Sequence, residues 1–90
     1  MTIPLQVDPH LVFVRPGVRP RTPGGCEECL AIGSGWVHLR LCLTCGNVGC
    51  CDSSIRRHAT KHFHNTLHPV IRSHEPGEAW LWCFVHEVLG

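Results

Sequence analysis

Hydrophobic and polar residues alternate along the segment GWVHLRLC, residues 35–42. One side of the alternation carries Trp36, His38, Arg40 and Cys42, and the other carries Val37, Leu39 and Leu41. Because successive side chains of a β-strand point to opposite faces of the sheet, this period of two predicts a strand. The two faces of that strand are expected to differ in chemistry.

The sequence after this strand predicts one helix and two more strands. The segment DSS, residues 52–54, offers side-chain oxygens that can cap the N-terminus of a helix running to about His64. The segments PVIRS, residues 69–73, and AWLWCFV, residues 79–85, have the β-branched and aromatic content of strands. Between them, the Pro-Gly pair at residues 76–77 suits the central positions of a type II turn.

Residues 15–25 contain three prolines and three glycines, which predicts an extended loop. This loop separates a short N-terminal arm from a body rich in cysteine and histidine. We therefore divide the chain into the arm and loop, residues 1–25, and the body, residues 26–90. At 90 residues the two parts are expected to form a single domain.

A chain of 90 residues buries a small apolar interior, and domains of this size often add disulfides or a structural metal. The seven cysteines are an odd number, which argues against a closed disulfide framework. The N-terminus has no basic segment, and its longest apolar run, residues 11–14, is too short for a signal sequence. No stretch approaches the ~20 apolar residues of a membrane span. We therefore expect reduced thiols, a cytoplasmic location and bound zinc.

The formal net charge of +1 does not favour a nucleic-acid or membrane surface. Basic residues are spread along the chain, and the tightest group is Arg56, Arg57 and Lys61. We interpret this group as the solvated face of a helix.

Metal chemistry is indicated by two C-x2-C pairs, Cys26 with Cys29 and Cys42 with Cys45, because this spacing lets two thiolates bind one ion. Together with Cys50, His58, His62 and His68 they supply eight ligands, enough for two closed tetrahedral zinc sites. Closed sites are structural, since a catalytic site keeps a position for water. The spacing leaves open how the eight ligands are shared. His64 is expected to face solvent.

Several motifs in order resemble the UBP-type zinc finger of ubiquitin-specific proteases, and small bacterial stand-alone members in particular. They are CEEC, WVHLRLCLTCGNVGCCD, HATKH, HP and EPGEAWLWC, and they extend from Cys26 to about Glu87. The resemblance implies an α+β fold, a twisted antiparallel sheet packed with one or two helices and cross-braced by zinc. It assigns Cys26, Cys29, Cys50 and His58 to one ion, and Cys42, Cys45, His62 and His68 to the other. Alignment favours Cys50 over its neighbour Cys51.

Relatives with an additional zinc carry an N-terminal C-x-H and a late C-x-x-C or C-x-x-D. The corresponding residues here are Asp8, His10, Cys83 and His86, all of which can ligate zinc. The resemblance therefore suggests a third site. The alternative is that both histidines are exposed and Cys83 is a buried strand thiol.

Eukaryotic relatives capture the free C-terminal diglycine of ubiquitin in a pocket with a Trp wall, an Arg and a late Tyr. The matching residues here are Trp36, Asp52 and Phe84. Asp52 reverses the charge of the Arg, and as an alternative it caps the predicted helix. We expect Trp36 to line a groove. Most of the other aromatic side chains, Trp80 and Trp82 among them, are expected in the core.

The predicted function is a zinc-binding recognition module, acting as a monomer on a protein C-terminal tail or a ubiquitin-like partner. One alternative is a purely structural zinc domain that serves as an accessory subunit. The other is a thiol enzyme, for which Cys51 and Cys83 are the only spare thiols. No oxyanion-type glycine motif accompanies them, so we do not expect catalysis.

Overall fold

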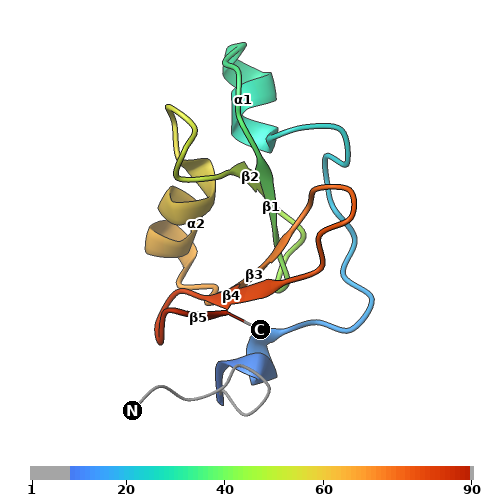
Figure 1. Ribbon diagram of the computed structural model, residues 1–90, viewed down its shortest axis with the longest axis vertical. Helices are drawn as coiled ribbons and strands as arrows, with labels where there is room; N and C mark the ends of the chain where they lie inside the picture. The colour runs from blue at the N-terminus through green and yellow to red at the C-terminus, as the bar shows by residue number, and fades with distance from the viewer. Residues whose placement is uncertain (1–8, 90) are drawn as a thin grey trace.

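The computed structural model describes residues 9–89, which form one five-stranded antiparallel sheet and short helices (Figure 1). A 3-10 helix, η2 (Pro9–Phe13), comes first and α1 (Glu27–Ile32) follows the proline-rich loop. The longest helix, α2 (His58–Thr66), separates β2 from β3. The strands are β1 (Leu39–Cys42), β2 (Val48–Cys50), β3 (Val70–Ser73), β4 (Leu81–Cys83) and β5 (Val88–Leu89), and their order in the sheet is β2-β1-β3-β4-β5. The α+β class with an antiparallel sheet and helices is thereby confirmed.

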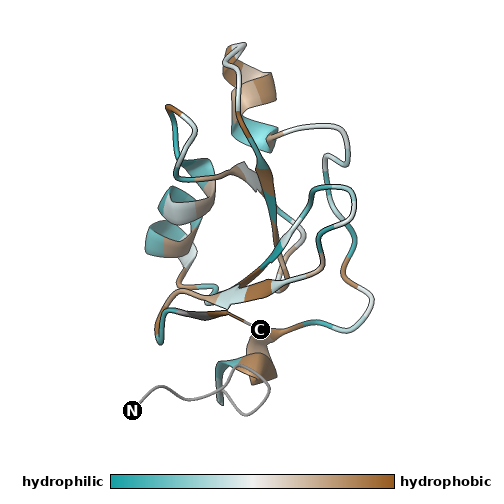
Figure 2. Ribbon diagram, viewed as in Figure 1, coloured by the Kyte–Doolittle hydropathy of each residue, from teal (hydrophilic) through white to brown (hydrophobic). Residues whose placement is uncertain are grey.

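The two faces of the sheet have different coverings, as the alternation along β1 predicts. Brown and teal alternate along this strand in Figure 2. Leu39 and Leu41 are buried in the main apolar cluster, against which Val14 and Val18 of the N-terminal loop pack. Arg40 points to the opposite face, the one on which α2 lies over β2.

The predicted strands and turn are found, with shorter bounds. The Glu78 amide donates to the Glu75 carbonyl at 3.1 Å, and Gly77 has φ +79°, which is the left-handed backbone that position i+2 of a type II turn requires. The last predicted strand stops at Cys83, where the chain turns into β5. Neither α1, which begins beside Cys26, nor the short β2 was predicted.

The start of α2 was predicted wrongly. The helix begins at His58, and its N-cap is Arg57 in the left-handed region with φ 48° and no side-chain cap. Asp52 does not cap the helix. It accepts a hydrogen bond from the Thr60 hydroxyl at 2.5 Å, so it ties the β2–α2 loop to the side of the helix. At the end of this loop, the His58 amide donates to Cys50 Sγ at 3.1 Å, so the start of α2 lies at the end of β2.

None of the helices within residues 9–89 has the length and apolar character needed to traverse a bilayer.

Candidate functional site

The first candidate metal centre is a buried group of three thiols and one imidazole, Cys26, Cys29, Cys50 and His58. Cys26 is the N-cap of α1, Cys29 lies in its first turn, Cys50 ends β2 and His58 begins α2. His58 Nδ1 lies 3.2 Å from Cys26 Sγ and 3.3 Å from Cys29 Sγ, while Cys29 Sγ and Cys50 Sγ are 3.9 Å apart.

These distances suit tetrahedral zinc. Bond lengths of ~2.3 Å to sulfur and ~2.0 Å to nitrogen place two tetrahedral sulfur ligands ~3.8 Å apart, and a sulfur and a nitrogen ~3.5 Å apart. Cys26, Cys29 and Cys50 form no disulfide bonds, so the close approach of their sulfurs has another cause. The donor set and its spacing therefore fit a structural zinc ion.

Surrounding groups orient the ligands of this first centre. The Cys29 amide donates to Cys26 Sγ at 3.5 Å and the His58 amide donates to Cys50 Sγ at 3.1 Å, and such donors favour thiolates. Glu28 Oε2 lies 3.4 Å from His58 Nε2, which leaves Nδ1 to face the sulfurs. Burial and the neighbouring Cys26 and Cys50 raise the pKa of Cys29 to about 12. A bound cation is therefore needed for several thiols of this group to be ionised at the same time.

The second candidate centre consists of Cys42, Cys45, His62 and His68. Cys42 Sγ is 3.6 Å from His68 Nδ1, and Cys45 Sγ is 3.4 Å from His62 Nε2. These distances also fit tetrahedral zinc. Burial and the adjacent His68 lower the pKa of His62, which favours the neutral, ligating form.

The turn between β1 and β2 shapes the second centre. Gly46 has φ +85°, and its amide donates to the Cys42 carbonyl at 3.0 Å. A Cβ at Gly46 would lie 2.2 Å from the carbonyl oxygen of Arg19, so glycine is needed for two reasons. The N-terminal loop thus packs directly on the turn that holds Cys42 and Cys45.

His58 and His62 lie on one face of α2 and still join different groups. Four helical residues advance the chain by ~6 Å, which exceeds the ~3.5 Å between two ligands of one zinc. His58 therefore meets the ligands at the end of β2, and His62 meets those of the β1–β2 turn. The structure brings together the same two sets that the family resemblance implies.

A third group contains His10 of η2, Cys83 of β4 and His86 of the following turn. Cys83 Sγ lies 3.5 Å from His10 Nδ1, and the His10 and His86 rings are 4.8 Å apart between centroids. These are three of the four residues suggested for a third site. The fourth, Asp8, lies outside the described residues.

Cys51 and His64 belong to none of the three groups that residues 9–89 contain. His64 is exposed, as expected. Cys51 Sγ lies 3.6 Å from Ser54 Oγ. Burial opposes ionisation of this thiol, but the Ser54 hydroxyl and nearby backbone groups lower its pKa to about 7.

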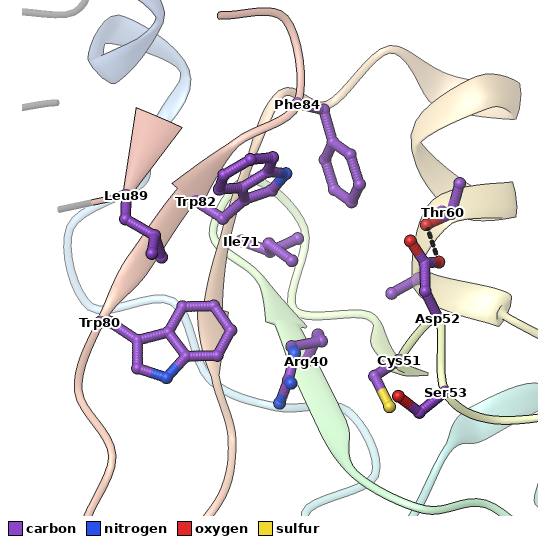
Figure 3. Close-up of a pocket in the computed structure, with 11 residues that line it drawn as sticks. Arg40, Cys51, Asp52, Ser53, Thr60, Ile71, Trp80, Trp82, Phe84 and Leu89 are labelled. Carbon is purple, nitrogen blue, oxygen red and sulfur yellow. Dashed lines mark hydrogen bonds between the residues drawn. The ribbon is translucent and has the colours of Figure 1, made fainter. Parts of the chain in front are cut away.

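Beside the first centre lies a cavity of about 450 Å³, within the usual size range of ligand sites. Trp80, Trp82 and Phe84 form one wall, and the β2–α2 loop and α2 form the other (Figure 3). Phe84 stacks on Phe63 with ring centroids 4.7 Å apart. The other residues that line the cavity are Arg40, Cys51, Asp52, Ser53, Ala59, Thr60, Ile71 and Leu89.

Of the three residues matched to the family pocket, Asp52 and Phe84 line this cavity and Trp36 does not. Trp36 packs instead against the main apolar cluster, and a Cβ on Gly25 would lie 2.6 Å from its ring. Trp36, which was expected to line a groove, therefore packs on the core. Trp80 and Trp82, which were expected in the core, line the cavity. The strand begins only at Leu39, after a bend at Val37, so the alternation does not extend back to Trp36.

Comparison with known proteins also supports zinc binding. A family model described as a Zn-finger in ubiquitin-hydrolases and other proteins matches residues 26–88. The solution NMR structure of protein RPA1320 from Rhodopseudomonas palustris is 54% identical, with a TM-score of 0.74 over 99% of this chain and 82% of that chain. The NAD-dependent deacetylase sir2A of Dictyostelium discoideum is 34% identical over 59 residues, 66% of this chain. The chain spans 10% of the deacetylase, so that likeness is limited to one segment.

Proposed function

The chain belongs to the family of zinc fingers found in ubiquitin hydrolases and other proteins, and from that premise we propose that it is a zinc-stabilised recognition module. Its ligand is the C-terminal tail of a protein or a ubiquitin-like partner. The observation that carries this proposal is the aromatic cavity of about 450 Å³ beside the first metal centre. The module acts as a monomer in the cytoplasm, where its cysteine thiols stay reduced.

Zinc has a structural role in this proposal. Cys26, Cys29, Cys50 and His58 hold one ion, and Cys42, Cys45, His62 and His68 hold a second. Both sets supply four sulfur or nitrogen donors, which closes a tetrahedral shell and leaves no position for a reactive water. The third group, His10, Cys83 and His86, binds a further ion.

The cavity supports tail binding through its shape and lining. An extended peptide end presents backbone donors and acceptors together with a small side-chain volume, and it fits between an aromatic wall and a polar loop. Trp80 and Trp82 are half-buried, so a peptide that covers them removes further apolar surface from water.

We propose no catalytic role. Cys51 lines the cavity, but its thiol contacts the Ser54 hydroxyl, and within residues 9–89 none of the three histidines of the first two groups is hydrogen-bonded to it as a base.

Titration of the zinc-loaded protein with ubiquitin tests the function. We expect saturable binding, followed by the fluorescence of the cavity tryptophans, and loss of binding when the last two glycines of ubiquitin are removed. Trp82→Ala should weaken binding, whereas His64→Ala, an exposed change outside the cavity, should not. If neither ubiquitin nor a peptide ending in diglycine binds, the protein is not a tail-recognition module of this kind.

A further inference from the structure

The cavity contains charged side chains of both signs. Asp52 is negatively charged, so it cannot attract a carboxylate. The cavity nevertheless contains a cation, Arg40, contributed by the outward face of β1. Figure 3 shows Arg40 between the Trp80 ring and the loop that carries Cys51 and Ser53.

The guanidinium of Arg40 is held in place by protein contacts. It lies over the Trp80 ring at 4.5 Å from the centroid, and its Nη1 donates to the Leu39 carbonyl at 2.9 Å. Stacking on an aromatic face fixes the plane of a guanidinium. Arginine has five N–H donors, so one hydrogen bond leaves an edge available for a two-pronged contact with a carboxylate.

The carboxylates near Arg40 already have other partners. Asp52 accepts from the Thr60 hydroxyl and Glu78 accepts from the Ser73 hydroxyl, each at 2.5 Å. Within residues 9–89 no ion pair joins Arg40 to either of them. The cavity therefore contains one cation, Arg40, that is available to a ligand. On its α2 side it contains one anion, Asp52, which is hydrogen-bonded to the Thr60 hydroxyl.

We infer that Arg40 binds the terminal carboxylate of the peptide tail, with the last residues lying between the aromatic wall and α2; this inference rests on the proposed function. The carboxylate pairs with the stacked guanidinium, while peptide N–H groups, which are hydrogen-bond donors, point toward Asp52. Arg40 is thus a specificity residue that selects chain ends over internal segments. Asp52 opposes the charge of the carboxylate and limits the affinity.

The test compares three synthetic peptides on the zinc-loaded protein: one ending in diglycine with a free carboxylate, its C-terminal amide, and an amidated version with glutamate as its last residue. Wild-type protein should bind the free acid ~10-fold or more tightly than the amide, as expected for a charge-assisted pair. The amidated glutamate peptide should bind no better than the plain amide. If it matches the free acid, Arg40 does not select chain ends.

Arg40→Gln should weaken binding of the free acid until the difference between acid and amide disappears. Arg72→Gln is the matched control, since Arg72 is an exposed arginine on the opposite face of the sheet and its loss changes the net charge equally. Retention of the acid preference in Arg40→Gln would overturn the inference while the proposed function stands. Absence of binding by both peptides to wild-type protein would overturn both.

A second variant keeps the test valid if Arg40→Gln does not fold. Asp52→Asn retains the hydrogen bond to Thr60 and removes the negative charge, so it should raise the ratio of the affinity for the free acid to the affinity for the amide. An unchanged or lower ratio would contradict a carboxylate held in this cavity. Zinc content and thermal unfolding of every variant establish that the compared proteins share one fold.

Discussion

Gly49 lies directly against the backbone of Ala59, and this contact sets the distance between β2 and α2. A Cβ on Gly49 would come within 2.6 Å of the Ala59 nitrogen and 2.7 Å of its Cα. Cys50 follows Gly49 in β2 and His58 precedes Ala59 in α2, and both belong to the first metal centre. The close approach of strand and helix therefore brings ligands from two elements to one point.

Gly49→Ala should consequently loosen the first centre. The added methyl cannot be accommodated without moving α2, because the atoms it meets are backbone, and we expect a loss of ~1–3 kcal/mol in unfolding free energy together with weaker zinc retention. Chemical denaturation of the zinc-loaded protein and competition with a chelating dye measure the two effects. Gly24→Ala meets nothing within 4 Å and should stay within ~0.5 kcal/mol of wild type. Equal stability of the two variants would contradict this account of the contact.

Adjacent cysteines provide a stringent test of the ligand assignment. Cys50→Ser should remove one zinc ion and cost ~3 kcal/mol or more, because the other ligands of the group would lose their cation. Cys51→Ser should retain the metal and cost ~1 kcal/mol or less, since serine can still hydrogen-bond to Ser54. Metal analysis and thermal unfolding report both results. The reverse pattern would assign the ligand to Cys51.

The third group predicts the metal content of the protein. Wild-type protein should contain three zinc ions per chain, and Cys83→Ser should contain two with both other centres intact. Elemental analysis after dialysis measures this, and His64→Ala, a histidine outside all three groups, should retain three. Two ions in wild-type protein would show that His10, Cys83 and His86 do not bind zinc.

Zinc affinity should rise with pH. Burial and two neighbouring thiols hold the pKa of Cys29 at about 12 without metal, so this thiol carries a proton at neutral pH that zinc must displace. Each displaced proton makes binding stronger as pH increases, and acidification should release zinc and unfold the domain. Chelator competition between about pH 6 and pH 8 should show this slope. An affinity that does not change with pH would mean that the thiols are ionised before zinc binds.

Trp36 is expected to affect stability more than recognition. Trp36→Ala should cost ~2 kcal/mol or more in unfolding free energy, because the ring packs on the apolar cluster and on Gly25. Its affinity for a diglycine-ended peptide, measured at a temperature where the variant is folded, should match that of wild type. Trp82→Ala should give the opposite result, with weak binding and a smaller loss of stability. If Trp36→Ala loses binding and Trp82→Ala does not, Trp36 belongs to the ligand site.

The chain's own pattern determined the faces of β1, the turn at Pro76 and Gly77, and the eight thiol and imidazole side chains that gather in the two four-residue groups. These features are local: side-chain alternation, the left-handed backbone of one glycine and the short reach of C-x2-C are all properties of neighbouring residues. The division of the eight into two sets followed from family resemblance, because spacing alone does not reveal which helix turn meets which strand end.

Only the tertiary structure decided the start of α2, the position of Trp36 and the origin of the charge in the cavity. Each depends on contacts between residues distant in sequence: Asp52 with Thr60, Trp36 with Gly25, and Arg40 with Trp80. A capping oxygen or an aromatic side chain has several partners of similar energy, and the packing of the whole sheet selects among them. That is why a helix cap and a groove wall predicted from the sequence became a loop tether and part of the core.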